Sequence, residues 1–325
     1  MSARNPYEYV FEPIQGVPAY CGFTASLNFV TLLVLFMILY NVPCLAVLLR
    51  LILFYLTSQK LKLGGIFNAF VKMQLFCTLY GLADFMAVRI PLTGFVTSYL
   101  ARNDPQTPMR IITLCFYTAL YSSQVFTVCF CSLRVTILYL SGYWQEKLEQ
   151  WFEILSPFIF IVSLISTAPQ FASGSICLQM SSPYPFGAIV IISSLHHYSL
   201  VPFNMTHFSI TSLVMLAISI STWLVFRKLS ERRQLRAKTN SAYKLKAEKT
   251  FTVTMVLILI PLAFLQLVSI AEIFHFPFIS YLFVVRPFIA DSRIHIVTVY
   301  FVLTHPALKR TGSTTGQASA HKATC

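Results

Sequence analysis

The chain has 325 residues, of which 56% are apolar and only 11% carry a charged side chain. An ordinary soluble domain has about 25% charged residues, because its surface faces water. This composition excludes an ordinary soluble globule, and the mean hydropathy of +0.70 favours a membrane protein. The net charge of +13 could suit nucleic acid, but the basic residues stand in short polar stretches between apolar blocks. Nucleic acid is therefore not an expected partner.

Seven apolar segments are long enough to cross the hydrocarbon core of a bilayer, which takes about 20 helical residues. They cover approximately residues 26–49, 65–88, 111–137, 151–171, 209–226, 250–271 and 279–303. The expected fold is therefore an all-α membrane protein, a bundle of seven transmembrane helices over residues 26–303. Residues 1–25 form an N-terminal segment before the bundle, and residues 304–325 form a polar tail after it.

Basic residues predict the orientation, because Lys and Arg concentrate in cytoplasmic loops. The connection between the fifth and sixth segments has nine basic residues from Arg227 to Lys249, whereas the N-terminal segment has only Arg4. We therefore expect the N-terminus outside and the C-terminus in the cytoplasm. Anionic lipid and an intracellular partner are both compatible with this basic stretch. The candidate contact residues are Arg227, Lys228, Arg232, Arg233, Arg236 and Lys238.

Two features of the expected outer loops suggest covalent modification. Asn204 begins an Asn-Met-Thr acceptor for N-glycosylation, in a stretch over 172–208 without Lys or Arg. Cys115, near the outer end of the third segment, and Cys177, in the next outer loop, are expected to form a disulfide in an oxidising compartment. Cys21 is an alternative partner for either cysteine.

Charged residues inside apolar segments need partners, since each costs about 2.5–3.5 kcal/mol at a helix centre on translocon scales. Asp84 in the second segment either packs against polar groups of a neighbouring helix or acts as a polar switch that couples helix positions. Arg134 near the inner end of the third segment either snorkels to the interface or forms a lock that opens on activation. Position alone does not choose between these interpretations.

The seventh segment carries Arg286 and Asp291, which are five residues apart. Pro287 interrupts the backbone hydrogen bonds directly after Arg286. Asp84 and Asp291 could share the bundle interior, with Arg286 or Arg293 as the counter-ion. We expect this polar network to have a conformational role.

Enzyme motifs are absent from the sequence: it contains no G-x-S-x-G, no H-E-x-x-H and no phosphate-binding loop. Its histidines show no spacing typical of a metal centre, and its cysteines show none typical of zinc. We therefore expect no catalytic activity, no metal and no cofactor.

Three stretches carry a resemblance to a known family. The third segment ends in FTVCFCSLRVTILYLSG, the sixth begins AEKTFTVTMVLILIP, and the seventh reads LFVVRPFIADSRIHIVTVYFVLTHPALKR. With the opening NPYEYVFEP, their order and spacing resemble the nematode serpentine chemoreceptors of the gamma superfamily, most closely class U, from Tyr7 to Arg310.

The resemblance implies a chemosensory G-protein-coupled receptor in the plasma membrane, such as that of a sensory neuron. Such a receptor binds an external small molecule or peptide in the outer half of its bundle and signals through a heterotrimeric G protein. Arg134 matches the arginine that ends the third helix, and Arg286, Pro287 and Asp291 match the seventh-helix motif. The chain departs from the rhodopsin type in lacking D-R-Y and N-P-x-x-Y. A membrane transporter of a small solute is the alternative function, although the sequence shows no internal repeat.

Overall fold

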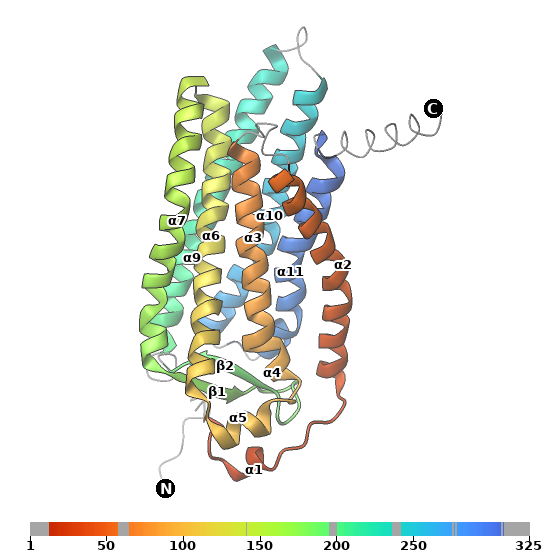
Figure 1. Cartoon of the computed structure of the whole chain (residues 1–325), viewed down its shortest axis with the longest axis vertical. Helices are drawn as coiled ribbons and strands as arrows, with labels where there is room; N and C mark the ends of the chain where they lie inside the picture. Colours follow the sequence, from red (N-terminus) through yellow and green to blue (C-terminus); the bar gives the residue numbers. More distant parts are fainter. Residues whose placement is uncertain are drawn as a thin grey trace, which may run out of the picture.

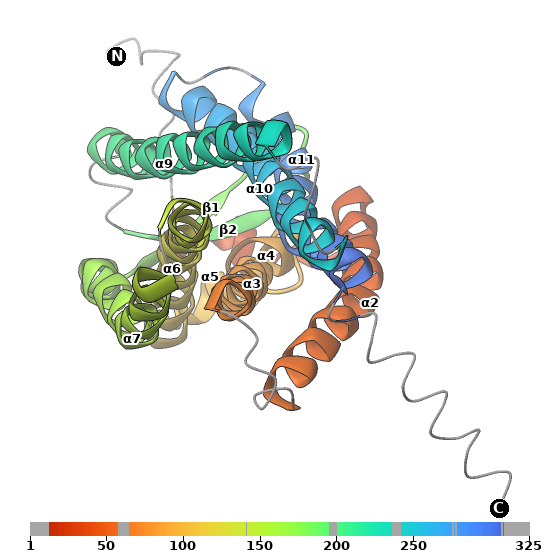
Figure 2. The ribbon, with the colours of Figure 1, turned by 90° about the horizontal axis from the view of Figure 1, so that it is seen from above.

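The computed structural model describes residues 13–57, 65–140, 142–194, 200–235, 242–274, 276, 278–306 and 308. In this part of the chain, long helices run side by side along the long axis of the molecule (Figure 1). They are α2 (Phe29–Thr57), α3 (Gly65–Asp84), α6 (Gln106–Tyr139), α7 (Gly142–Ser173), α9 (Leu200–Leu235), α10 (Ala242–Ile273) and α11 (Ile279–Thr304). Figure 2 shows α3 and α6 side by side, with α7 beyond α6 and with α2 and α11 beyond α3.

Short elements gather at one end of the bundle, which we call the hairpin end (Figure 1). Helix α3 continues there through a π-helix, η2 (Phe85–Arg89), into α4 (Ile90–Leu92). The antiparallel strands β1 (Ser175–Gln179) and β2 (Ile189–Ser193) pair with Cys177 opposite Ile191. Helices α1 (Pro18–Cys21) and α5 (Thr97–Asn103) complete this end.

The stretch between the fourth and fifth apolar segments is more ordered than the sequence suggests. Part of it forms the β-hairpin, and α9 already begins at Leu200, ahead of the apolar segment expected from residue 209. The apolar pattern marks only the part of a helix that suits lipid, and a helix can continue beyond it into polar sequence. Asn204 therefore lies in α9 and not in a loop.

Six of the described helices are long and apolar enough to cross a membrane. Helix α11 has 26 residues, which gives a length of about 39 Å and exceeds the hydrocarbon thickness of about 30 Å. Its composition sets it apart, because it carries Arg286, Asp291 and Arg293. Those side chains point into the protein, where Asp291 is 2% exposed and Arg293 is 4% exposed.

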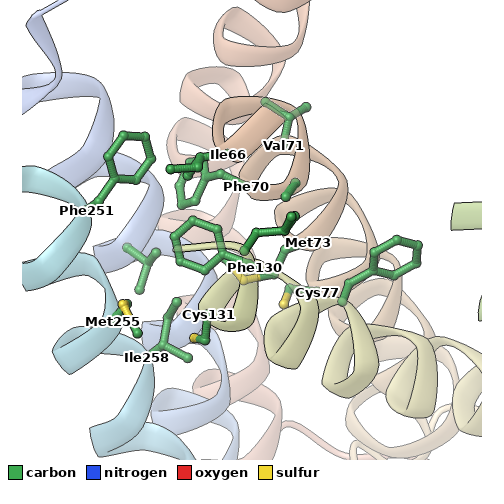
Figure 3. Packing of buried hydrophobic residues seen from close by; sticks show 14 of the residues in the cluster. Ile66, Phe70, Val71, Met73, Cys77, Phe130, Cys131, Phe251, Met255 and Ile258 are labelled. Atoms are coloured by element: carbon green, nitrogen blue, oxygen red, sulfur yellow. The ribbon is translucent and has the colours of Figure 1, made fainter. Parts of the chain in front are cut away.

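Aromatic and sulfur-containing side chains fill the middle of the bundle (Figure 3). Phe70 of α3 stacks on Phe301 of α11 with ring centroids 3.8 Å apart. Phe76 of α3 stacks on Phe126 of α6 at 4.6 Å. Large apolar side chains also face outward, for example on α7, as expected for a helix in contact with lipid.

The hairpin end is closed by contacts between segments that are distant in sequence. The Ile14 amide donates to the carbonyl of Cys177 over 3.1 Å, and the Gly16 amide donates to the carbonyl of Ala101 over 2.9 Å. The Thr97 hydroxyl donates to the carbonyl of Gly187 over 2.6 Å. The segment before α2, the hairpin and α5 therefore form one packed cover on the bundle.

Candidate functional site

The main polar feature of the interior is an ion network centred on Arg89, the last residue of η2. Its two Nη atoms donate to the two carboxylate oxygens of Asp291 on α11, each over 2.7 Å. Its Nε donates to Asp84 at the end of α3 over 2.6 Å. All three side chains are at most 3% exposed. Short, bidentate and charge-assisted bonds are the strongest hydrogen bonds in proteins, so Arg89 clamps α3 to α11.

The π-helix explains how one arginine can bind both carboxylates. Asp84 and Arg89 are five residues apart, and in a regular α-helix they would lie about 140° apart around the axis. The wider turn of η2 brings Arg89 back toward the face that carries Asp84. Single π-turns of this kind are frequent at functional sites.

Helix α2 joins the network through two neighbouring residues. The Tyr40 hydroxyl donates to Oδ2 of Asp291. Asn41 Nδ2 donates to the same oxygen over 3.1 Å and to the carbonyl of Met37 over 2.7 Å. Asn41 Oδ1 lies 2.6 Å from Nε2 of His295. Since this oxygen can only accept, the His295 Nε2–H is the donor, and α2 is bound to α11 at two points.

Arg286 forms the second positive group of the network. Its Nη2 donates to the Tyr80 hydroxyl over 3.1 Å and lies 3.7 Å from Oδ1 of Asp84. Two guanidinium groups thus balance two carboxylates, so the network is electrically neutral without any added ion. Neutrality matters because an unpaired charge is costly in a dehydrated interior.

The structure brings together Asp84, Asp291 and Arg286, as the sequence suggested, but Arg89 is the residue that bridges the two carboxylates. Sequence reasoning misses Arg89 because its position two residues before Pro91 is typical of a helix end. The sequence does contain a sign of its role, because Arg89 is a charged residue inside an apolar stretch, five residues after Asp84. Arg293 is not the counter-ion, since it reaches α6 instead, at the Ser123 carbonyl and the Thr127 hydroxyl.

A separate contact joins α6 to α10 at the opposite end of the bundle. Arg134 is 3% exposed, and its Nη2 donates to the carbonyl of Glu248 over 3.3 Å. Its guanidinium also lies 5.5 Å from the ring centroid of Phe251. The side chain is thus buried against α10 and does not snorkel along the surface of the bundle.

The expected disulfide between Cys115 and Cys177 is not formed in this structure, in which both thiols are free. The Cys177 sulfur faces Sδ of Met109 at 3.5 Å. Cys115 follows Met109 by six residues, which is about 9 Å along α6 and about 120° around it, and its side chain is exposed. Burial, together with Asp104, raises the pKa of Cys177 to about 12, so this thiol stays protonated. Cys21 is also free.

The remaining predicted contact residues lie at the far end of α9 and beyond it. Arg227 and Lys228 pair with Glu231 at 3.4 and 3.1 Å. Arg232 and Arg233 belong to α9, but their side chains lie outside the described residues, as does the side chain of Asn204. Arg236 and Lys238 lie wholly outside them. In the described part of the chain, no cluster of His, Cys, Asp and Glu side chains is suited to a metal ion.

Comparison with known proteins gives a family with the same architecture. Residues 14–311 match the family model described as serpentine type 7TM GPCR chemoreceptor Sru. The chain is also similar to "Serpentine receptor class U-26" of Caenorhabditis elegans, with 28% identity over 247 residues, or 74% of this chain and 84% of that protein. The family match spans every long helix described above, including the charged α11. This chain is a multi-pass membrane protein that belongs to the Sru family of serpentine seven-transmembrane chemoreceptors.

Proposed function

We propose that this protein binds an external ligand in the outer half of its bundle and signals to a heterotrimeric G protein at the opposite end. In this proposal the hairpin end faces outward, and the basic ends of α9 and α10 face the cytoplasm. The observation that carries the proposal is the Arg89 clamp, which holds α2, α3 and α11 in one relative arrangement near the hairpin end. Family membership supplies the receptor class.

A receptor responds when a ligand binds one of two helix arrangements better than the other. We place the ligand among α6, α9, α10 and α11, close to the clamp. The clamp suits a two-state element, because α11 is held by several directional bonds on one carboxylate, Asp291. Rotation or sliding of α11 would break these bonds together and not one by one.

The contact of Arg134 with α10 would transmit the change to the cytoplasmic end. While Arg134 binds the Glu248 carbonyl and Phe251, it keeps α10 against α6. Separation of these helices would expose Arg134 to an intracellular partner, beside the basic ends of α9 and α10. Basic residues there also suit anionic lipid headgroups.

Guanine-nucleotide exchange in the absence of any ligand tests this proposal. We would express the full chain with heterotrimeric G proteins and measure basal exchange for the natural protein and for Asp291→Asn. The substitution weakens the clamp, so basal exchange should rise several-fold. The matched control is Asp104→Asn, an exposed residue after α5, which should leave exchange unchanged. Equal exchange with and without the receptor, for both proteins, would contradict coupling to those G proteins.

A further inference from the structure

Arg293 carries a positive charge that the ion network does not compensate. It lies midway along α11, is 4% exposed, and donates through Nη2 to the Ser123 carbonyl and the Thr127 hydroxyl, which are both neutral. Among the described residues its Nε–H has no acceptor, and none of the ion pairs involves it. An arginine cannot shed its proton in a protein, so this charge needs a partner.

The nearest acid in sequence cannot fill that role. Asp291 precedes Arg293 by two residues, which places the two side chains about 200° apart around α11. Asp291 is also fully engaged by Arg89, Tyr40 and Asn41. Asp84 in turn is shared by Arg89 and Arg286. One guanidinium therefore remains in excess in a region that excludes water, where unpaired charges are strongly unfavourable.

A second unsatisfied polar side chain lies at the same level of the bundle. Gln74 of α3 is 0% exposed, and neither its Nε2 nor its Oε1 has a hydrogen-bond partner among the described residues. Phe70 packs on Phe130 and Phe76 on Phe126, with ring centroids 5.7 and 4.6 Å apart. Since α3 and α6 are antiparallel, these pairs set Gln74 level with Thr127.

Two buried cysteines lie near these polar side chains on α3 and α6. Cys77 follows Gln74 by one helical turn, and Cys131 follows Thr127 by one turn. Both belong to the buried cluster drawn in Figure 3, where they point into the interior from α3 and α6. The amide of Gln74 and the free Nε–H of Arg293, which also binds Thr127, therefore lie at the same level of the bundle.

We propose that Arg293 and Gln74 form a binding site for a small monovalent anion of the size of chloride. The anion would accept hydrogen bonds from the Arg293 Nε–H and the Gln74 amide, and it would neutralise the excess charge. It would thereby stabilise the packing of α3, α6 and α11. The proposed anion binding does not depend on G-protein coupling.

Thermal unfolding of the purified full chain in detergent tests the proposal. Sodium chloride is replaced by sodium gluconate at constant ionic strength, because gluconate is much larger than chloride. Chloride should raise the unfolding midpoint saturably, by about 2–4 °C when its concentration exceeds the dissociation constant about tenfold. Bromide, a halide of similar size, should act in the same way.

Substitutions test whether the chloride effect on the unfolding midpoint arises at this site. Arg293→Met should abolish the chloride response and should unfold in gluconate at or above the temperature of the natural protein, because it removes the excess charge. Gln74→Met should require more chloride for half-saturation. Arg227→Met, which changes an exposed arginine of α9, should keep the full response.

A natural protein without a chloride response, or an Arg293→Met protein that retains it, would overturn the proposal. If Arg293→Met does not fold, the Gln74→Met titration decides: an unchanged half-saturation point would overturn the site as described. These outcomes say nothing about nucleotide exchange, so failure of this proposal and failure of the proposed function are distinguishable.

Discussion

Among the described side chains, Arg89 alone forms buried ion pairs with carboxylates on two different helices. Replacing a whole buried ion pair with apolar groups can be nearly neutral for stability, whereas removing one partner leaves the other charge unpaired. Removal of Arg89 would leave Asp84 with Arg286 at 3.7 Å, and Asp291 with only neutral donors. Single substitutions in the clamp should therefore lower the stability of the fold, whereas paired substitutions that remove both charges should lower it less.

Arg89→Met should lower the free energy of unfolding by about 3–5 kcal/mol, the usual cost of breaking a buried ion pair. Denaturant or thermal unfolding in detergent measures it. Adding Asp291→Asn should recover part of the loss, because the unpaired carboxylate is then removed. The control is Arg102→Met, which changes an arginine on the exposed surface of α5. An Arg89→Met protein as stable as this control would contradict the clamp.

His305, directly after α11, should make stability depend on pH. Its ring stacks on Phe301 at 4.8 Å and packs against Phe251 at 5.4 Å, and burial lowers its pKa to about 4. The unfolded chain binds this proton near pH 6.5, so the stabilisation is complete above pH 6.5 and is lost as pH falls toward 4. The loss reaches at most about 3 kcal/mol. His305→Phe should flatten this part of the pH–stability curve, and an unchanged curve would contradict the assignment.

At the level of elements, the hairpin end depends on glycine. Gly187 has a φ of +88°, and a Cβ there would lie 2.2 Å from the ring of Phe23. Phe23 also packs edge-on against Phe186 with centroids 5.8 Å apart. A side chain at this position would thus be strained and would also push the segment before α2 away from the hairpin.

Gly187→Ala should lower the free energy of unfolding by about 1–3 kcal/mol, the usual cost of a strained backbone position. It should also speed cleavage of the segment before α2 in limited proteolysis. Gly22→Ala is the matched control, because Gly22 has a φ of −89° and the nearest atom to an added Cβ is 3.7 Å away. Equal proteolysis of the two variants would show that this segment does not depend on the Gly187–Phe23 contact.

The long helices were predictable from sequence, because apolar length alone distinguishes a membrane-crossing helix from other elements. The β-hairpin was not, since SICLQ and IVIIS are short apolar runs whose pairing depends on contacts with distant segments. The Arg89 clamp was missed for a related reason. Helical periodicity assumes 3.6 residues per turn, and the π-turn over Phe85–Arg89 breaks that period. The spacing of the cysteines in the sequence also could not show that the Cys177 thiol packs against Met109.

The whole molecule has two chemically different ends. One end is closed by the hairpin and the segment before α2, and the other leads into the basic stretch between α9 and α10. Because these are the two ends of the same helices, they face opposite sides of the membrane, as signalling from an outside ligand to an inside partner requires. The side on which the C-terminus lies depends on α11, the long helix with the most charged interior face.

The decisive experiment is therefore to map the topology of the full chain, with one epitope tag before Met1 and another after Cys325. We would stain intact and permeabilised cells with antibodies to each tag. We expect the N-terminal tag to be accessible on intact cells and the C-terminal tag to be accessible only after permeabilisation. Staining of both tags on intact cells would mean that the chain crosses the membrane an even number of times, and it would contradict the proposed signalling mechanism.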